Sequence, residues 1–161
     1  MKTKIFTAVL FLCFWGYTSK LYAQLTQKQQ DKIKKEIIAV DDSIFALFDR
    51  SDIEAALMFY SPNFVCYGSD GERYDLQQIR QNYLDMYKTL ASSKWIPYHL
   101  DFLVITKNKV VITQDGKNEL IMKSGVKFNF DPSHYTFSFE KIEGLWKLCY
   151  HHFSGQYVKL I

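Results

Sequence analysis

His99 and Asp101 lie two positions apart and are the first residues in this sequence that could share acid–base chemistry. Their segment has strand character, in which residues i and i+2 point to the same face. The two side chains could hold one ligand together, and a surface pair that faces solvent has the same pattern. His151 and His152 follow each other in the last expected strand and point to opposite faces, so they cannot bind one metal ion together. No zinc-ligand spacing occurs in the sequence, and we expect no metal site.

Asp41 is the carboxylate whose position is least ordinary. It lies in an expected helix, within the apolar arc that Phe45 and Phe48 define at about 100° per residue. A carboxylate on a buried helix face needs a hydrogen-bonding partner, or it retains its proton. Asp41 is therefore either solvated at the rim of the buried face or directed into a pocket, and the pattern leaves both open.

The familiar hydrolase and phosphate-binding motifs are not present. Ser154 lacks the Gly-x-Ser-x-Gly elbow of a nucleophilic serine. Ser124 and Lys127 match Ser-x-x-Lys in spacing alone, because they fall on an expected turn and strand instead of a helix start. There is also no Gly-rich phosphate loop, so we expect no cofactor.

Three helices are expected in the first half of the chain. Thr26 with Gln29, Ser51 with Glu54 and Asp75 with Gln78 are capping-box pairs that predict helices to about residues 50, 60 and 91. The first is the longest, and its apolar residues recur every three or four positions, which is typical of a helix with one buried face. A short strand is expected over 63–67, between the second and third helices.

Strands are expected from Trp95 to the end, with turns at Asn108, Asp115-Gly116, Ser124-Gly125 and Asp131-Pro132. The last two strands form a hairpin around Gly144. In its second strand, strict alternation predicts one face with Trp146, Leu148, Tyr150, His152 and Ser154, and the other with Leu145, Lys147, Cys149, His151 and Phe153. The order of elements predicts a single α+β domain over residues 24–161.

Residues 1–23 differ in kind from the rest of the chain. Lys2 and Lys4 precede a short apolar run, and Ala23 ends a plausible cleavage site, so we expect a signal peptide and an exported protein. The apolar run is too short to span a membrane comfortably. Without its three lysines, the 20 Lys and Arg of the chain fall to 17, equal to its 17 Asp and Glu. A neutral mature chain favours neither a nucleic-acid partner nor a membrane partner. Of the mature cysteines, Cys66 and Cys149, the sequence favours two buried thiols over a disulfide.

The C-terminal run from Gly144 to Gly155, with its Gly-x-Trp and His-x-Ser pattern, resembles the nuclear transport factor 2-like (NTF2-like) superfamily, which includes SnoaL-like and DUF4440 domains. Its final strand is also similar to that of the calmodulin-dependent kinase association domain. The helix over 52–60 with the following Ser61-Pro62, and the helix start at Asp75, belong to the same resemblance, which covers residues 29–155. It implies a long helix and two shorter ones against a strongly curved, mostly antiparallel sheet, a cone open at one end, and commonly a homodimer.

The same superfamily contains enzymes and non-catalytic proteins, so the resemblance does not define one reaction. Our first hypothesis is an exported domain without catalysis, which binds a small, largely apolar ligand or serves in dimerisation. The alternative is a dehydratase- or isomerase-like enzyme whose acid–base residues are His152 or His99 with Asp41. The expected pocket residues are Tyr67, Arg80, Tyr83, Trp95, Tyr135, Trp146 and His152. A homodimer is expected to form through the outer face of the sheet, because the last strand is apolar on both sides and one layer of helices covers only one of them.

Overall fold

Capping residues determine where the helices begin in the computed structural model, which describes residues 25–160. The long helix α2 (Gln27–Asp49) starts at the expected capping box of Thr26 and Gln29. Helix α4 (Leu76–Thr89) starts at the third expected box, where the Asp75 carboxylate accepts a hydrogen bond from the Gln78 N–H. The predicted signal peptide, residues 1–23, lies outside the described residues. No helix within residues 25–160 is long and apolar enough to cross a membrane.

The N-cap of the short helix α3 (Ile53–Leu57) lies one residue after the predicted cap, Ser51. Asp52 is the N-cap, and its carboxylate accepts a hydrogen bond from the Ala55 N–H at 3.3 Å. Ser51 instead belongs to the end of α2, because its N–H donates to the Phe48 carbonyl and its φ is 61°. A left-handed residue after a helix closes that helix and cannot cap the next one. The predicted capping box of Ser51 and Glu54 is therefore wrong.

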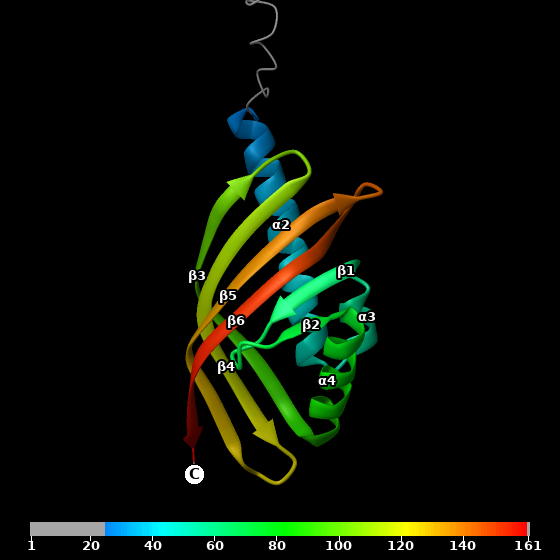
Figure 1. The fold of residues 1–161 in the computed structure, drawn as a ribbon. Helices are drawn as coiled ribbons and strands as arrows, with labels where there is room; N and C mark the ends of the chain where they lie inside the picture. The colour runs from blue at the N-terminus through cyan, green and yellow to red at the C-terminus, as the bar shows by residue number, and fades with distance from the viewer. Residues whose placement is uncertain (1–24, 161) are drawn as a thin grey trace, which may run out of the picture.

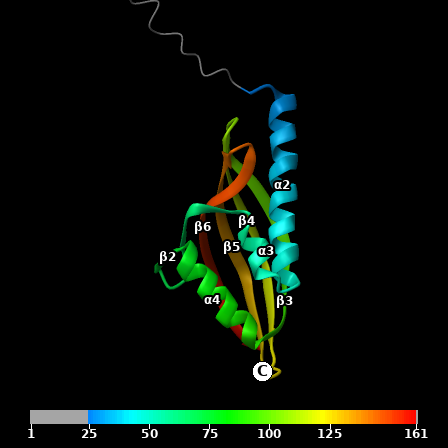
Figure 2. The ribbon, with the colours of Figure 1, turned by 90° about the vertical axis from the view of Figure 1, so that its right-hand side faces the viewer.

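Six strands form one sheet in the order β2-β1-β6-β5-β4-β3. The strands are β1 (Tyr60–Tyr67), β2 (Arg73–Asp75), β3 (Leu90–Ile105), β4 (Lys109–Met122), β5 (Lys127–Ile142) and β6 (Leu145–Leu160). All neighbours pair antiparallel except β1 and β6, which are parallel. Figure 1 shows the long strands β3 to β6 curving along their length past α2, and Figure 2 shows α3 and α4 beside the C-terminal half of α2. The α+β class predicted from the sequence is confirmed.

Two of the turns predicted inside this sheet are wrong. Asp115-Gly116 continues strand β4, and Asp131-Pro132 continues strand β5 with a cis peptide bond. Gly116 is a site of close approach: a Cβ there would lie 2.7 Å from Cζ2 of Trp95. A glycine inside a strand often has this role, and its sequence signal does not differ from that of a turn.

The hydrophobic core lies between α2 and the inner face of the sheet. Ile37 and Phe139 are fully buried and represent its two sides. The other buried members come from the three helices and from four strands, β1, β4, β5 and β6: Ile33, Ile44, Ile53, Leu57, Tyr60, Phe64, Cys66, Ile79, Val110, Ile112, Phe137, Trp146 and Leu148. Strands β2 and β3 contribute partly buried side chains. Residues far apart in sequence therefore stabilise one core.

Ile37 and Ile38 provide a matched test of this packing, because they are neighbours on α2 with 0% and 40% of their surface exposed. Ile37→Ala removes buried methyl groups and leaves a cavity, so we expect it to lower the free energy of unfolding by about 2–5 kcal/mol. Ile38→Ala makes the same chemical change and should cost less than about 1 kcal/mol. Urea unfolding of both variants measures the difference. Equal losses would contradict the described orientation of α2.

Candidate functional site

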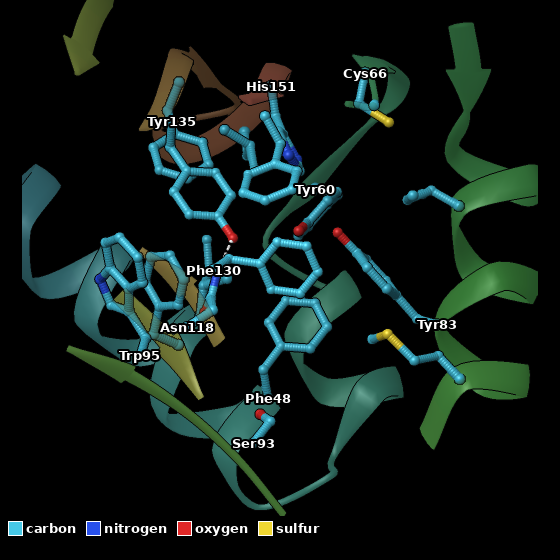
Figure 3. A pocket seen from close by; sticks show the side chains of 18 of the residues that line it. Phe48, Tyr60, Cys66, Tyr83, Ser93, Trp95, Asn118, Phe130, Tyr135 and His151 are labelled. Carbon is cyan, nitrogen blue, oxygen red and sulfur yellow. Dashed lines mark hydrogen bonds between the residues drawn. The ribbon is translucent and has the colours of Figure 1, made fainter. Parts of the chain in front are cut away.

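A cavity of about 270 Å³ lies between α2, α4 and the inner face of the sheet. Phe45 and Phe48 of α2 line it from one side, and Tyr83 of α4 from another. Figure 3 shows the sheet residues Trp95 and Tyr135 on a further side, with the strands behind them. These elements are separate in sequence, so the cavity exists only in the folded chain.

Aromatic rings that pack on one another form one wall of this cavity. The rings of Phe45 and Trp95 are stacked with centroids 5.2 Å apart, and Tyr135 meets Trp95 edge-on at 5.1 Å. Across the cavity, Phe48 meets Tyr83 edge-on at 4.8 Å. Because each ring is held by another ring, the wall is rigid and does not need to collapse into the open space.

Several polar atoms interrupt the apolar lining. Asn118 Nδ2 donates to the Tyr135 hydroxyl at 2.6 Å, and the hydroxyls of Tyr87 and Ser93 are 3.1 Å apart. Burial raises the pKa of three tyrosines that line the cavity, Tyr60, Tyr83 and Tyr135. In Figure 3, the hydroxyls of Tyr60 and Tyr83 point toward each other from opposite sides. A largely apolar cavity with a few placed polar groups is typical of a small-molecule site.

His151 is the lining residue with the least satisfied side chain. Its exposed fraction is 8%, and its buried ring nitrogen Nδ1 has no hydrogen-bond partner among the described residues. Burial, with a smaller contribution from neighbouring His152, lowers the pKa of His151 to about 4. The imidazole is therefore neutral at pH 7 and has one donor and one acceptor available. A buried polar group without a partner is costly, so this histidine indicates a site that a ligand or water would complete.

A β-bulge in β6 explains why His151, and not the predicted His152, faces the cavity. Ser138 pairs with Tyr150 and Phe139 pairs with Leu148, which leaves Cys149 as an extra residue in β6. One extra residue reverses the alternation of every side chain that follows. The predicted face is therefore correct up to Leu148 and wrong beyond it, and His152 lies exposed on the outer face.

Asp41 lies in the cavity wall and is 4% exposed, so the solvated-rim alternative is wrong. One carboxylate oxygen, Oδ2, accepts a hydrogen bond from Nε2 of Gln114 on β4. Burial raises the pKa of Asp41 to about 7; the Gln114 hydrogen bond opposes this effect and the negative charge of Asp42 adds to it. The amide oxygen of Gln114 has no hydrogen-bond partner among the described residues. A protonated Asp41 could donate to that oxygen, which is consistent with a carboxyl group that is neutral for part of the time.

Four of the seven expected pocket residues line the cavity, namely Tyr67, Tyr83, Trp95 and Tyr135. Of the other three, His152 is exposed on the outer face of the sheet, and Arg80 and Trp146 do not line the cavity. Arg80 is exposed and forms an ion pair with Glu54. Trp146 is buried in the core, where its Nε1 donates to Glu36 at 2.8 Å.

The remaining candidate residues either lie away from the cavity or are unreactive at neutral pH. His99 pairs with Asp101 at 3.0 Å, and both side chains are more than half exposed on the sheet surface. Cys66 lines the cavity, and burial raises the pKa of its thiol to about 11, so it is protonated at neutral pH. Cys66 and Cys149 are both free. Within residues 25–160, no group of three or more His, Cys, Asp or Glu side chains is arranged to hold a metal ion.

Some lining residues were missed because the sequence carries no clear signal for them. The sequence places Asn118 at an ordinary strand position, Ser93 between an expected helix and an expected strand, and Tyr60 at the end of a helix. His151 was considered, but the bulge that turns it inward has no glycine or proline to mark it. For Tyr60, the available signal was Ser61-Pro62, since proline allows an edge or starting strand position as well as a helix stop.

A long helix and two short ones against a curved six-stranded sheet, with a cavity between them, define an NTF2-like domain of the cystatin-like fold. Residues 37–158 match the family described as the SnoaL-like domain. This is more than half of the chain, and the protein belongs to this family. The resemblance noted in the sequence is thereby confirmed. No curated protein gives a significant sequence match.

Solved structures with the same fold have diverse descriptions. A hexachlorocyclohexane dehydrochlorinase from Novosphingobium barchaimii LL02 has a TM-score of 0.69 at 10% identity, and the match covers 80% of this chain and 90% of that one. An NTF2-like protein from Cytophaga hutchinsonii has a TM-score of 0.61 at 13% identity, with coverages of 82% and 100%. A protein described as a candidate calcium/calmodulin-dependent protein kinase II association domain, from Xanthomonas campestris, has a TM-score of 0.66 at 21% identity, with coverages of 75% and 86%. At these identities the likeness extends to the fold alone.

Asp41 and His151 should affect the pH dependence of stability in opposite directions. The folded pKa of Asp41 is raised from 3.8 to about 7, so its contribution to the free energy of unfolding falls as pH rises through that window. The folded pKa of His151 is lowered from 6.5 to about 4, so its contribution rises with pH between 4 and 6.5. Over this range each effect amounts to about 3 kcal/mol, and in the native chain they nearly cancel.

Single variants should separate the two effects. Relative to the native chain, Asp41→Asn should gain about 3 kcal/mol of stability between pH 4 and pH 6.5, and His151→Leu should lose about as much. His152→Leu is the matched control, because His152 is exposed, and its profile should run parallel to the native one. Urea unfolding across this pH range measures all four proteins. Parallel profiles for all of them would contradict the described burial of Asp41 and His151.

Proposed function

We propose that this protein binds a small, largely apolar molecule in the cavity between α2, α4 and the sheet, without catalysing its conversion. The proposal depends mainly on His151, a buried and neutral imidazole that lines the aromatic cavity and whose Nδ1 has no hydrogen-bond partner among the described residues. Such a group costs stability unless an occupant satisfies it. The rigid ring wall supports the same function, because a preformed apolar cavity needs little rearrangement to bind.

The ligand chemistry follows from the lining. Aromatic rings provide most of its surface, so a ring or branched hydrocarbon of modest size would make the main contacts. The hydroxyl of Tyr83, the imidazole of His151 and the Asn118–Tyr135 pair provide polar atoms for one or two groups on the ligand. A hydroxyl or carbonyl group suits these partners, because neutral donors and acceptors are available.

A second candidate function is a proton-transfer enzyme of the dehydratase or isomerase kind. It is favoured by the presence of Asp41 and His151 in one cavity, where burial raises the pKa of the acid and lowers the pKa of the imidazole. The pKa of about 4 makes His151 a weak base, and this is why we place binding first. A bound compound that is converted by the native protein and by His152→Leu, but at least a hundredfold more slowly by His151→Leu and Asp41→Asn, would favour the enzyme.

The binding proposal predicts different effects for two adjacent histidines. We use 4-tert-butylphenol as the probe, because its branched ring suits the aromatic wall and its hydroxyl can donate to an imidazole. His151→Leu should weaken binding about tenfold, since it removes a buried hydrogen-bond partner worth about 1.5 kcal/mol. His152→Leu should bind like the native protein, because that side chain is outside the cavity.

Calorimetric titration of the three proteins measures this difference. Mass spectrometry of an organic extract of the purified native protein can identify a natural occupant. No detectable probe binding by the native protein, together with an empty extract, would refute the proposed binding function. Equal weakening by both histidine variants would instead contradict the role of His151.

We also propose that the protein forms a homodimer through the outer face of the sheet, as the sequence predicts. The structure changes the side chains on which this proposal rests. The outer face is more polar than alternation predicted, since His99, Asp115 and His134 are paired in register across β3, β4 and β5. Leu103 is an apolar side chain of the sheet that remains 61% exposed and would gain from a partner surface.

The mass of residues 24–161 by size-exclusion chromatography with light scattering tests the dimer. We expect twice the calculated mass at tens of micromolar, and we expect Tyr150→Lys to reduce it to that of the monomer, because the bulge turns Tyr150 outward. A native protein that elutes as a monomer would refute the dimer.

A further inference from the structure

The lining of the cavity can carry negative charge but not positive charge near neutral pH. Two carboxylates line it, Asp41 in the wall and the exposed Asp49 at the solvent-facing edge. Among the described residues that line it there is no lysine or arginine. His151 does not supply a positive charge, because burial lowers its pKa to about 4.

Five further titratable groups that line the cavity are neutral near pH 7. They come from the strands and from α4, and burial raises the pKa of each of them above its ordinary value: Tyr60, Cys66, Tyr83, Tyr87 and Tyr135. On its own helix, Asp42 is exposed and adds further negative charge. The field at Asp41 therefore has no positive source within the cavity.

Hydrogen bonds hold both carboxylates in place, and each carboxylate can still accept a further hydrogen bond or interact with a cation. Asp41 Oδ2 accepts a hydrogen bond from Gln114, and a carboxylate has further lone pairs on its two oxygens that can accept. Asp49 accepts hydrogen bonds from the Trp95 backbone and the Ser93 side chain, which fix it beside the aromatic wall. A positive group in the cavity would lie between one buried acid and one exposed acid.

Aromatic rings attract cations as well as apolar groups. The electron-rich face of Trp or Tyr binds an alkylammonium group, and the attraction increases when water is excluded. Trp95 and Tyr135, with centroids 5.1 Å apart, are part of a cluster that also includes Phe45 and Phe137. The wall thus offers π systems near the carboxylates that a cation would neutralise.

We infer that the cavity selects an organic cation, namely a quaternary ammonium or similar alkylammonium group on a small apolar body. This inference rests on the proposed binding function and specifies the charge of the ligand. A quaternary ammonium has no N–H groups to satisfy, so its apolar methyl groups can contact the rings directly. A carboxylate or phosphate ligand would meet Asp41 as a like charge and would find no basic partner in the lining.

Two probes of the same shape test the inference. (4-Hydroxyphenyl)trimethylammonium and 4-tert-butylphenol differ in that a charged nitrogen replaces the central carbon of the branched group. At pH 8, above the pKa of about 7 for Asp41, we expect the cation to bind at least tenfold more tightly than the neutral probe by calorimetry. Asp41→Asn keeps the size of the side chain and should abolish this preference, so that the two probes bind this variant with affinities within threefold of each other.

The outcomes separate the inference from the function on which it rests. If the neutral probe binds and the cation binds equally or more weakly, the cation inference is overturned and the binding function stands. If neither probe binds to the native protein, both are overturned. Should Asp41→Asn fail to fold, which circular dichroism detects, Asp49→Asn replaces it: a smaller preference in that variant supports the inference, and an unchanged one overturns it.

Discussion

One extra residue in strand β6 determines which side chains this fold places inside. Cys149 has no counterpart in β5, so Trp146 and Leu148 face the core before it and His151 faces the cavity after it. Strict alternation would have placed Tyr150 and His152 inward instead. The inner face would then carry a different set of polar groups, and the unpartnered imidazole would lie in solvent. A bulge of this kind bends the strand while it redirects the chain, and both effects contribute to the curved wall.

The cavity remains open because its rings support one another. Phe45, Trp95 and Tyr135 contact each other at 5 to 6 Å between centroids, so none of them can rotate into the space without losing a partner. Gly116 contributes from the next strand, since a side chain there would collide with the Trp95 indole. Burial of Asp41 and His151 in this wall reduces stability, because the cost of ionising Asp41 develops as pH rises from about 4 to 7 and the cost of charging His151 develops as pH falls from 6.5 to about 4. Ionisable groups are seldom buried without charged partners. Two of them with displaced pKa values in one cavity are typical of a functional site.

The fold could be predicted from the sequence because its signals are local and repeated. The capping pairs at Thr26 and Asp75 and the alternation in β5 each depend on a few neighbouring residues. The site could be predicted only in part, because its geometry depends on pairing between distant strands. Asp115-Gly116 is a typical turn sequence, but Gly116 lies inside a strand and allows close contact with Trp95. The bulge at Cys149 can be recognised only from the pairing of β6 with Ser138 and Phe139 of β5. A shift by one position is enough to exchange His151 for His152.

The balance between binding and catalysis rests on the same two groups. A general base works best when its pKa is near the operating pH, and the buried imidazole is about three units below pH 7. An occupant that excludes more water would lower that pKa further unless it carried negative charge, which the neighbouring Asp41 disfavours. A cation has the opposite effect on Asp41, because it stabilises the ionised carboxylate and removes the cost of burying it. A positive ligand would therefore lower the cost of the buried negative charge on Asp41, whereas a proton on His151 would add a second buried charge at further cost.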